Sequence, residues 1–373
     1  MTSGLAHGGA ETMLLKLLER IDRKRFDPYV ISLTGMGDIG PRIRDRGIPV
    51  LTMNIRGVAS ALGGLFRLSQ QLRRLRPVAV QTWMYHADLL GGIAARIAGV
   101  RAIAWGIRNT NLDRDKTKLS TRLVVMCSAL ASRWLPTGIL SNSEVARDAH
   151  IARGYSAVKM AIIPNGFDLM HFKPNQEARL SVREELRVAS DTPLVGIVGR
   201  YDPLKNHVGF LEAAGLVLRI RPEVHFVMIG KGLDGLNSTL AAAARRAGAA
   251  EAVHWLGQRN DISRLMASLD VLASSSFGEA FPNAIGEAMA CGVPCAVTDA
   301  GDSAAIVSDT GRVVSPGDMA ALAVAIGDLL ALPAANRHAL GVRARARVEE
   351  HFEIGQVVRR YEDYYCHLTR TEA

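Results

Sequence analysis

The segment 271–297, VLASSSFGEAFPNAIGEAMACGVPCAV, contains in one stretch the alternation of elements that decides the fold. Its two ends, 271–274 and 294–297, are short apolar runs typical of buried parallel strands. Between them, Pro282 suits the first position of a helix, and Gly292 followed by Pro294 suits the end of one. The segment therefore predicts a strand–helix–strand unit of an α/β protein.

The same alternation extends along most of the chain in both directions. Further strand-like runs, separated mostly by amphipathic stretches, lie at 29–33, 78–82, 102–105, 138–141, 160–163, 195–198, 225–229 and 253–256. After residue 318 the pattern is helical to the end. A chain of 373 residues exceeds what one core comfortably fills. We therefore expect two doubly wound α/β units.

The composition limits which binding partners and which cellular compartment the protein is expected to have. The net charge of +9 favours an anionic partner such as a sugar nucleotide, an anionic lipid or a nucleic acid. Aromatic residues make up only 5% of the chain and do not interleave with its arginine clusters, which argues against nucleic acid. The four cysteines lack metal-ligand spacing, and no apolar run approaches the roughly 20 residues that cross a bilayer. We expect a cytoplasmic protein.

The helix start at 282–284 has the features of a phosphate site. Unpaired amides at such a start attract phosphate, and the small Ala284 lets a ligand approach closely. Glu279 before the helix and Glu287 within it could accept hydrogen bonds from neutral sugar hydroxyls. This pattern indicates recognition of a sugar nucleotide, and the alternative is a surface helix with solvated glutamates.

Two cations follow the strand at 195–198, in the segment VGIVGRYDPLKNH of residues 195–207. Arg200 offers a planar fork and Lys205 a point charge, a combination that suits a nucleoside diphosphate. The alternative is a pair of solvated loop cations. Gly8 and Gly9 open a predicted helix and Gly230 ends a predicted strand, and each could instead be a plain turn. His86 lies at another helix start, where it could donate to a sugar hydroxyl or simply pack.

These motifs together resemble the retaining glycosyltransferases of family 4, the group 1 enzymes of bacterial polysaccharide type. The E-x7-E signature corresponds to Glu279 and Glu287, with Phe-Pro-Asn after the first glutamate and Ala-Cys-Gly-Val-Pro after the second. Gly-Gly-Ala-Glu at 8–11, Gly-Arg with Lys-Asn at 199–206 and Gly-x-Gly at 230–232 match as well. The resemblance covers essentially the whole chain except a first apolar strand, which relatives have before the Gly-Gly loop.

The resemblance implies a GT-B fold, with two Rossmann-like doubly wound domains facing a cleft. Residues 1–170 would form the acceptor-side domain, 171–190 a linker, 191–348 the donor domain, and 349–373 a helix that packs back on the first domain. The first strand of the first domain is expected to be missing, which would expose an apolar strand edge. We therefore expect the physiological chain to begin upstream of Met1; the alternatives are that another segment fills the gap or that the domain tolerates the absence of the strand.

The implied reaction moves a sugar from a UDP- or GDP-type donor to a hydroxyl of a glycan or polyprenyl-diphosphate-linked acceptor. It would serve cell-surface polysaccharide synthesis, either lipopolysaccharide or exopolysaccharide, with hexosyl or N-acetylhexosaminyl transfer, retention of configuration and neither a metal nor another cofactor. The alternatives are a nucleotide-sugar-binding protein without transfer activity and an epimerase of the same fold.

The resemblance also assigns residues to roles. Arg108 and Asn109 are candidate contacts for the sugar or acceptor, but they depart from the Thr-x-His of many relatives: Arg108 stays cationic and is expected near phosphate or an acidic acceptor rather than as a titrating group. The implied catalytic residues are Glu279, His86, Arg200 and Lys205, and the implied donor contacts are Gly8, Gly9, Arg200, Lys205, Gly230, Phe281, Pro282, Asn283, Ala284 and Glu287.

One helical stretch, 62–76, suggests attachment to a membrane. Its leucines at 65, 68, 72 and 75 recur at helical spacing among four arginines. This pattern suits a peripheral helix on the anionic inner face of a membrane. The alternative is a helix that covers the sheet and exposes a basic edge.

Overall fold

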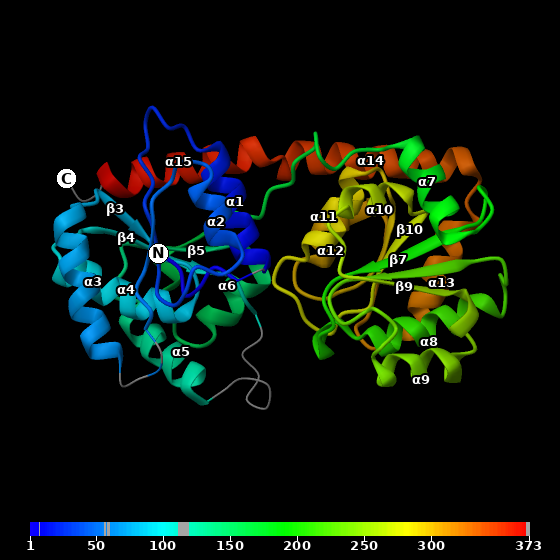
Figure 1. Ribbon diagram of the computed structural model, residues 1–373, viewed down its shortest axis with the longest axis horizontal. Coiled ribbons are helices and arrows are strands. Elements are labelled where there is room, and N and C mark those ends of the chain that lie inside the picture. Colours follow the sequence, from blue (N-terminus) through cyan, green and yellow to red (C-terminus); the bar gives the residue numbers. More distant parts are fainter. Residues whose placement is uncertain (7, 56, 58–59, 111–118, 371–373) are drawn as a thin grey trace. The chain divides into compact units, whose positions relative to one another are not determined.

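The computed structural model describes residues 1–6, 8–55, 57, 60–110 and 119–370. By its internal contacts the chain divides into two compact units (Figure 1). The first unit comprises Met1–Gly166 and Ile354–Ala373, and the second comprises Phe167–Glu353. The chain therefore passes between the units twice, at 166/167 and at 353/354.

The second unit is built on one six-stranded parallel sheet in the order β12-β11-β10-β7-β8-β9. The order runs outward in both directions from β7 and β10, as in a Rossmann-type doubly wound sheet. The strands are β7 Leu194–Val198, β8 His225–Ile229, β9 Val253–Gly257, β10 Val271–Ser274, β11 Cys295–Thr298 and β12 Arg312–Val314.

Helices cover both faces of this sheet (Figure 1). Each face has its own core of buried apolar side chains, which is why the central strands are apolar throughout rather than alternating. One face carries α8 His207–Leu218, α9 Ser238–Ala247 and α13 Met319–Ala331. The other carries α7 Gln176–Leu186, α10 Ile262–Ser268, α11 Asn283–Ala290, α12 Ser303–Val307 and α14 Ala334–Phe352. The short 3-10 helices are η3 Pro203–Lys205, η4 Ala250–Ala252 and η5 Ser308–Thr310.

The predicted linker 171–190 is an integral part of the second unit, which corrects the expected boundary. Its helix α7 buries Arg183, whose Nη2 lies 2.7 Å from Oδ2 of the buried Asp270. The same carboxylate oxygen accepts the amide of Leu194 at the start of β7, at 2.9 Å. Glu185 of α7 also pairs with Arg259 and Arg264, each at 2.7 Å. Proline and glycine around this segment indicated a hinge, but its polar side chains anchor it to the sheet.

In the first unit, four strands form a parallel sheet in the order β3-β4-β5-β6, and β1 and β2 form a separate parallel pair. Thr2 lies between the two sheets and bridges Ser32 on one side and Trp83 on the other. The combined order is therefore β2-β1-Thr2-β3-β4-β5-β6, which is again a doubly wound arrangement. The strands are β1 Val30–Ser32, β2 Val50–Thr52, β3 Ala79–Gln81, β4 Ala102–Ile107, β5 Gly138–Ser141 and β6 Met160–Ile162.

Residues 1–3 thus occupy the position predicted to lack a strand. The amide of Thr2 donates to Ile31 O and its carbonyl accepts from Leu33, both at 2.9 Å, while Trp83 N donates to Met1 O at 2.9 Å. Thr2 is only 1% exposed. The place of the central strand is filled by a short bridged segment rather than left as an open apolar edge.

The helices of the first unit also form two layers around the sheet (Figure 1). On one side, α1, α2 and α15 share a core with β1 and β5. The first-unit helices are α1 Gly9–Arg20, α2 Ile39–Arg44, α3 Ala61–Leu75, α4 Tyr85–Ile97, α5 Leu119–Ala131, α6 Glu144–Ile151, η2 Ala157–Lys159 and α15 Ile354–Arg370. The last helix, α15, buries Val357 and Tyr361 in this core, so the C-terminal segment belongs to the first unit.

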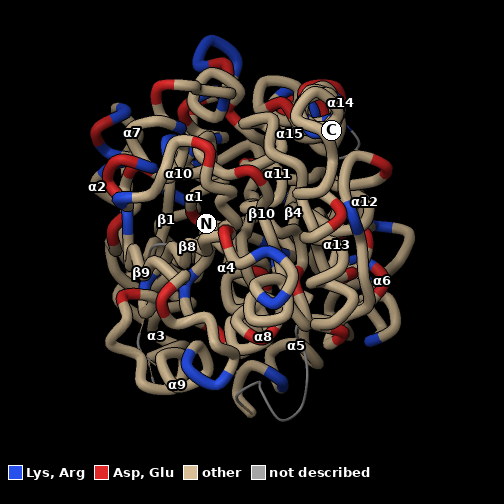
Figure 2. Tube along the Cα trace, turned by 90° about the vertical axis from the view of Figure 1, so that its right-hand side faces the viewer, with Lys and Arg blue, Asp and Glu red and all other residues tan. Residues whose placement is uncertain are grey.

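The predicted strands coincide with observed ones, with shifts of one or two residues at their ends. The two strands without a prediction, β2 and β12, have three residues each. Within the described part of the chain, no single helix is long and apolar enough to cross a membrane. The helices α13 and α14 reach that length and composition together, but they meet at a bend of 112°. Basic and acidic positions are intermixed along the chain in the view of Figure 2.

Candidate functional site

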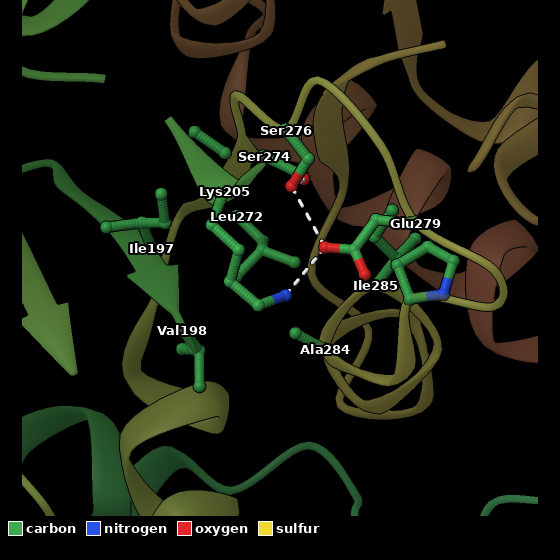
Figure 3. A pocket seen from close by; sticks show the side chains of 11 residues that line it. Ile197, Val198, Lys205, Leu272, Ser274, Ser276, Glu279, Ala284 and Ile285 are labelled. Carbon is green, nitrogen blue, oxygen red and sulfur yellow. Dashed lines mark hydrogen bonds and ion pairs between the residues drawn. The ribbon is translucent and has the colours of Figure 1, made fainter. Parts of the chain in front are cut away.

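The candidate site of the second unit lies at the carboxyl ends of β7 and β10. These neighbouring strands flank the point where the strand order reverses, which is where open α/β sheets bind ligands. A small pocket opens there, lined by the ends of both strands, the loop after β10 and the first turn of α11 (Figure 3). Its lining includes Ile197, Val198, Lys205, Ser274, Ser276, Glu279, Pro282, Ala284 and Ile285.

An ion pair between Lys205 and Glu279 is the main polar feature of this pocket (Figure 3). Lys205 Nζ lies 2.6 Å from Glu279 Oε1, and the same oxygen accepts the hydroxyl of Ser276 at 3.0 Å. The Glu279 side chain is 15% exposed and that of Lys205 27%, so both remain accessible from the pocket. The sequence predicted separate partners for these two groups, and the structure joins them.

The backbone around Lys205 is held by the loop that carries Glu279. Asp202 caps η3 by accepting the amide of Leu204 at 3.0 Å. The hydroxyl of Ser275 contacts the carbonyls of Lys205 and Asn206 at 2.9 and 2.8 Å. Phe277 N donates to Leu204 O at 2.7 Å. The positions of the ammonium and the carboxylate are thus set by two loops that are bonded to one another.

The Glu279 loop is also fixed from its other side. Gly301 has a φ of +59°, and a Cβ at this position would lie 2.4 Å from Glu279 O. Asp302 N donates to Ala280 O at 3.0 Å, and the Thr298 hydroxyl donates to Ser276 O at 2.7 Å. A glycine is required at 301 because of both the positive φ and this close approach.

The helix α11 begins at Asn283, with Pro282 as its N-cap rather than its first residue. Pro282 and Ala284 line the pocket, so the first turn of α11 lies beside the ion pair. Phe281 does not face the pocket, which corrects its predicted donor contact. Its ring is 7% exposed and packs on Phe167 and Phe352, with ring centroids 6.1 and 5.7 Å away, because the turn directs it into the core.

Three further predicted donor residues of the second unit, Glu287, Arg200 and Gly230, are not among the residues that line the pocket. Glu287 is on α11, four residues after Asn283, and is partly exposed. The Arg200 side chain is 65% exposed and pairs with Asp202 at 3.2 Å. Gly230 has a φ of +148°, and a Cβ there would lie 2.1 Å from Gly199 O, so the loops after β7 and β8 cross at two glycines. The close partner of Gly230 is therefore protein backbone.

His207 is a neighbour of the pocket that the sequence reasoning did not single out. It is 1% exposed at the start of α8, and neither ring nitrogen has a hydrogen-bond partner, although the Gly199 backbone lies nearby. Burial, and then the adjacent Lys205 cation, lower the pKa of His207 to about 4. The ring is therefore neutral near pH 7.

The corresponding end of the first sheet carries Gly8, Gly9 and His86. Gly8 is the N-cap of α1 and Gly9 its first residue, and both follow the bridged segment at Thr2. His86 is the second residue of α4, which follows β3, and its side chain is exposed. The two predicted loops thus follow the two adjacent segments at which the first sheet reverses its order.

A buried histidine supports the start of α4. His150 Nδ1 donates to the Ala146 carbonyl at 2.6 Å, so Nε2 of the neutral ring accepts the Tyr85 hydroxyl at 3.0 Å. Burial lowers the pKa of His150 to about 4. Because Tyr85 is the first residue of α4, this contact fixes the helix end that carries His86.

Arg108, predicted as a contact for the sugar or acceptor, lies in the interior of the first unit, where protein groups surround its guanidinium. It is 8% exposed, and its Nη1 donates to Asn165 Oδ1 at 2.9 Å. Its Nη2 donates to the Tyr361 hydroxyl, and the guanidinium stacks 3.9 Å from the Trp83 ring centroid. The side chain thus joins the end of β4 to α15. Asn109 next to it is partly exposed, and its carbonyl accepts from the Tyr85 hydroxyl at 3.3 Å.

Cations and helix amides, rather than acidic clusters, are the groups available to hold a ligand. Among the described residues, no three His, Cys, Asp or Glu side chains gather as a metal site would require. Two Rossmann-like units in one chain, with a lysine and a helix start at the reversal point of the second, are the arrangement expected of a GT-B fold.

Comparisons with known proteins identify the family. Residues 192–331 match the model described as glycosyl transferases group 1, and residues 7–171 match that of glycosyltransferase family 4. Together the two matches span most of the chain, and the chain belongs to the group 1, family 4 glycosyltransferases.

Relatives with known names agree with this assignment. The chain is 27% identical over 299 residues to the UDP-Gal:alpha-D-GlcNAc-diphosphoundecaprenol alpha-1,3-galactosyltransferase of Escherichia coli, covering 78% of this chain and 76% of that enzyme. The structure of Anabaena HepE in complex with UDP has a TM-score of 0.85 at 23% identity, covering 97% of each chain. HepE with UDP-glucose gives a TM-score of 0.83 at 24% identity, covering 98% of this chain and 97% of the other.

Proposed function

We propose that this glycosyltransferase moves a hexose from a UDP-sugar to a hydroxyl of a lipid-linked glycan, with retention of configuration, in cell-surface polysaccharide synthesis. The observation that carries the proposal is the Lys205–Glu279 pair beside the start of α11, at the reversal point of the second sheet. This arrangement places a cation, the first turn of a helix and a carboxylate at one small pocket. A sugar diphosphate needs all three.

In the proposed complex, the donor separates the two members of the ion pair. Lys205 and the amides of α11 bind the diphosphate, with Arg200 turning toward it from its exposed position. Glu279 then accepts a hydroxyl of the sugar. Stabilising the departing diphosphate by fixed charges lowers the barrier because those charges are in place before the reaction.

The transfer step needs no side-chain base in the second unit. The bond from the anomeric carbon to the diphosphate oxygen breaks, a bond from that carbon to the acceptor oxygen forms on the same face, and the acceptor proton passes to the leaving phosphate. His86, exposed at the start of α4, is proposed to donate a hydrogen bond to the transferred sugar. Gly8 and Gly9 are proposed to let the start of α1 approach the same sugar. We expect the step to proceed without a metal ion.

The choice of substrates rests on similar proteins. HepE is seen with UDP and with UDP-glucose, which favours a uridine donor over a guanosine donor. The Escherichia coli relative is named for an acceptor linked to diphosphoundecaprenol, which favours a lipid-linked acceptor. An enzyme with such an acceptor would work at the cytoplasmic face of a membrane.

Incubation with labelled UDP-glucose, UDP-galactose and their N-acetyl and GDP counterparts, together with a bacterial lipid extract, tests the proposal. Label that enters the lipid fraction from a UDP-hexose is the expected result. Conversion of the free donor to another sugar nucleotide would show an epimerase. Donor binding without either change would show a binding protein, and both outcomes would overturn the proposal. The anomeric configuration of the product, read by NMR, tests retention.

A further inference from the structure

An exposed apolar stripe runs along α5 of the first unit. Leu119, Leu123, Met126 and Leu130 recur at intervals of three and four residues, which places them on one face of the helix. Each is between 53% and 67% exposed, and Trp134, just beyond the helix end, is 60% exposed. Single exposed leucines are ordinary, but a continuous stripe of this kind indicates a surface that binds something apolar.

The other face of α5 accounts for its attachment to the unit. Val125, Ser128 and Ala129 are buried, and the helix packs beside α4 (Figure 1). The helix is apolar overall but has only 13 residues. At 1.5 Å per residue this is about 20 Å, shorter than the roughly 30 Å hydrocarbon core of a bilayer. The exposed stripe therefore suits a helix that lies along an apolar layer rather than one that crosses it.

The charges beside the stripe are positive. From residue 119 to 136 the chain has no Asp or Glu, but it has Arg122 within the helix and the exposed Arg133 after it. Lys159 adds a third positive charge near Trp134. Its Nζ donates to the carbonyls of Arg133 and Pro136 at 2.7 Å each, which places the ammonium beside this segment. An apolar stripe with basic residues beside it and a tryptophan at its end is the pattern of a helix at an anionic lipid interface.

We propose that α5, with Trp134, is the surface by which this protein lies on an anionic membrane. The inference deepens the proposed function, since a lipid-linked acceptor would be met at such a surface. It also relocates the membrane contact predicted for α3. On α3, Leu68 and Leu72 are buried, so half of the predicted leucine stripe belongs to the core of the unit. The large apolar side chains of α3 that are strongly exposed are Leu62 and Phe66.

Flotation with vesicles of phosphatidylcholine alone or with one quarter phosphatidylglycerol tests the proposal without donor or acceptor. We expect the wild type to float with the anionic vesicles at low salt. The double variant Leu123→Ser/Met126→Ser should partition at least tenfold less, because two exposed apolar side chains no longer enter the lipid. Arg122→Gln and Arg133→Gln should each lower partitioning about fivefold at low salt and less at high salt.

The matched control is Leu62→Ser/Phe66→Ser on α3, which removes two strongly exposed apolar groups elsewhere on the same unit. It should float as the wild type does. If the α3 variant loses binding and the α5 variant keeps it, or if no form floats, the proposal is wrong. Neither result would bear on transfer to a soluble acceptor, so failure here is distinguishable from failure of the proposed function.

Trp134 gives a direct readout of the surface. It is far more exposed than the buried Trp83 and Trp105, so lipid should shift its emission to the blue and brominated lipid should quench it. Trp134→Phe should remove most of both changes. Sedimentation without lipid tests the alternative that the α5 surface binds a second copy of this chain. A stable dimer that Leu123→Ser/Met126→Ser dissociates would overturn the membrane assignment.

Discussion

Each unit has a cation that follows a strand of its sheet, and the two cations have different surroundings. In the second unit, Lys205 lies at the pocket and its partner is another pocket residue, Glu279. In the first unit, Arg108 follows β4 but turns inward, where Asn165, Tyr361 and Trp83 contact its guanidinium. One cation is thus available to a ligand, while the other holds a strand end to α15. A charged residue after a strand therefore does not by itself indicate a binding group, since its partners decide its role.

The largest effect is expected for Glu279→Gln. Transfer should fall about 10²- to 10³-fold, because a fixed charge at the reacting sugar is lost. UDP binding should stay as tight as in the wild type or become tighter, because Lys205 is freed from its carboxylate partner. Single-turnover transfer together with UDP titration measures both.

The control for this variant is Glu287→Gln, on the helix that follows the Glu279 loop but outside the pocket lining. It should reduce transfer by less than about tenfold. Equal losses in the two variants would contradict the distinct role given to Glu279.

A second prediction contrasts the two arginines. Arg108→Met should lower the free energy of unfolding by about 2–4 kcal/mol, because it removes the buried hydrogen bonds of the guanidinium to Asn165 and Tyr361 and its contact with Trp83. Arg200→Met should change stability by less than about 0.5 kcal/mol, because its side chain is 65% exposed. Urea unfolding curves of the two variants give both values.

The order of the two variants should reverse when UDP binding is measured instead of stability. Arg200→Met should weaken it and Arg108→Met should leave it unchanged in the folded protein. An Arg108 variant with wild-type stability and impaired transfer would show that the guanidinium acts on substrate after all.

A smaller effect concerns acid stability. The pKa values of His150 and His207 are lowered to about 4 in the folded chain, against about 6.5 when unfolded. The unfolded chain therefore binds more protons below pH 6.5. The stability contributed by the neutral rings is complete above that pH and is lost as the pH falls toward 4. Each ring should cost on the order of 2 kcal/mol at pH 5.

The two histidines should differ when the ring is replaced. His207→Phe should flatten the pH dependence at little cost at pH 7.5, because no hydrogen bond is lost. His150→Phe should cost about 1–3 kcal/mol at pH 7.5, because the Tyr85 hydroxyl loses the nearer of its two acceptors and keeps only the Asn109 carbonyl at 3.3 Å. Unfolding measured at pH 5 and 7.5 tests this, and parallel pH profiles for wild type and His207→Phe would refute it.

Much of the fold could be predicted from the sequence because parallel strands buried on both faces are continuous apolar runs. The strands β2 and β12 were not predicted, because an apolar pattern of three residues is too short to recognise. The segment 1–3 escaped for a different reason. Thr2 is a single bridged residue and is not part of an apolar run, so no sequence pattern indicates a strand there, although it is bonded to segments on both sides.

The site was predictable in part. The residues that line the pocket through short-range motifs, namely Lys205, Glu279 and Ala284, were found from spacing and resemblance. The direction in which a side chain points could not be predicted from the sequence. Phe281 lies within the signature and yet packs into the core, and Arg108 is a cation that is buried. The pairing of Lys205 with Glu279 joins residues 74 positions apart, which no local pattern encodes.

Titration of the purified protein with UDP most directly tests the claim that Lys205 marks the donor site. Lys205→Ala should bind UDP about 10- to 100-fold more weakly than the wild type, since a charge-assisted bond worth roughly 1.5–3 kcal/mol is lost. Lys173→Ala, which removes an exposed lysine of the same unit outside the pocket lining, should bind as the wild type does. UDP affinity that Lys205→Ala leaves unchanged would contradict the account.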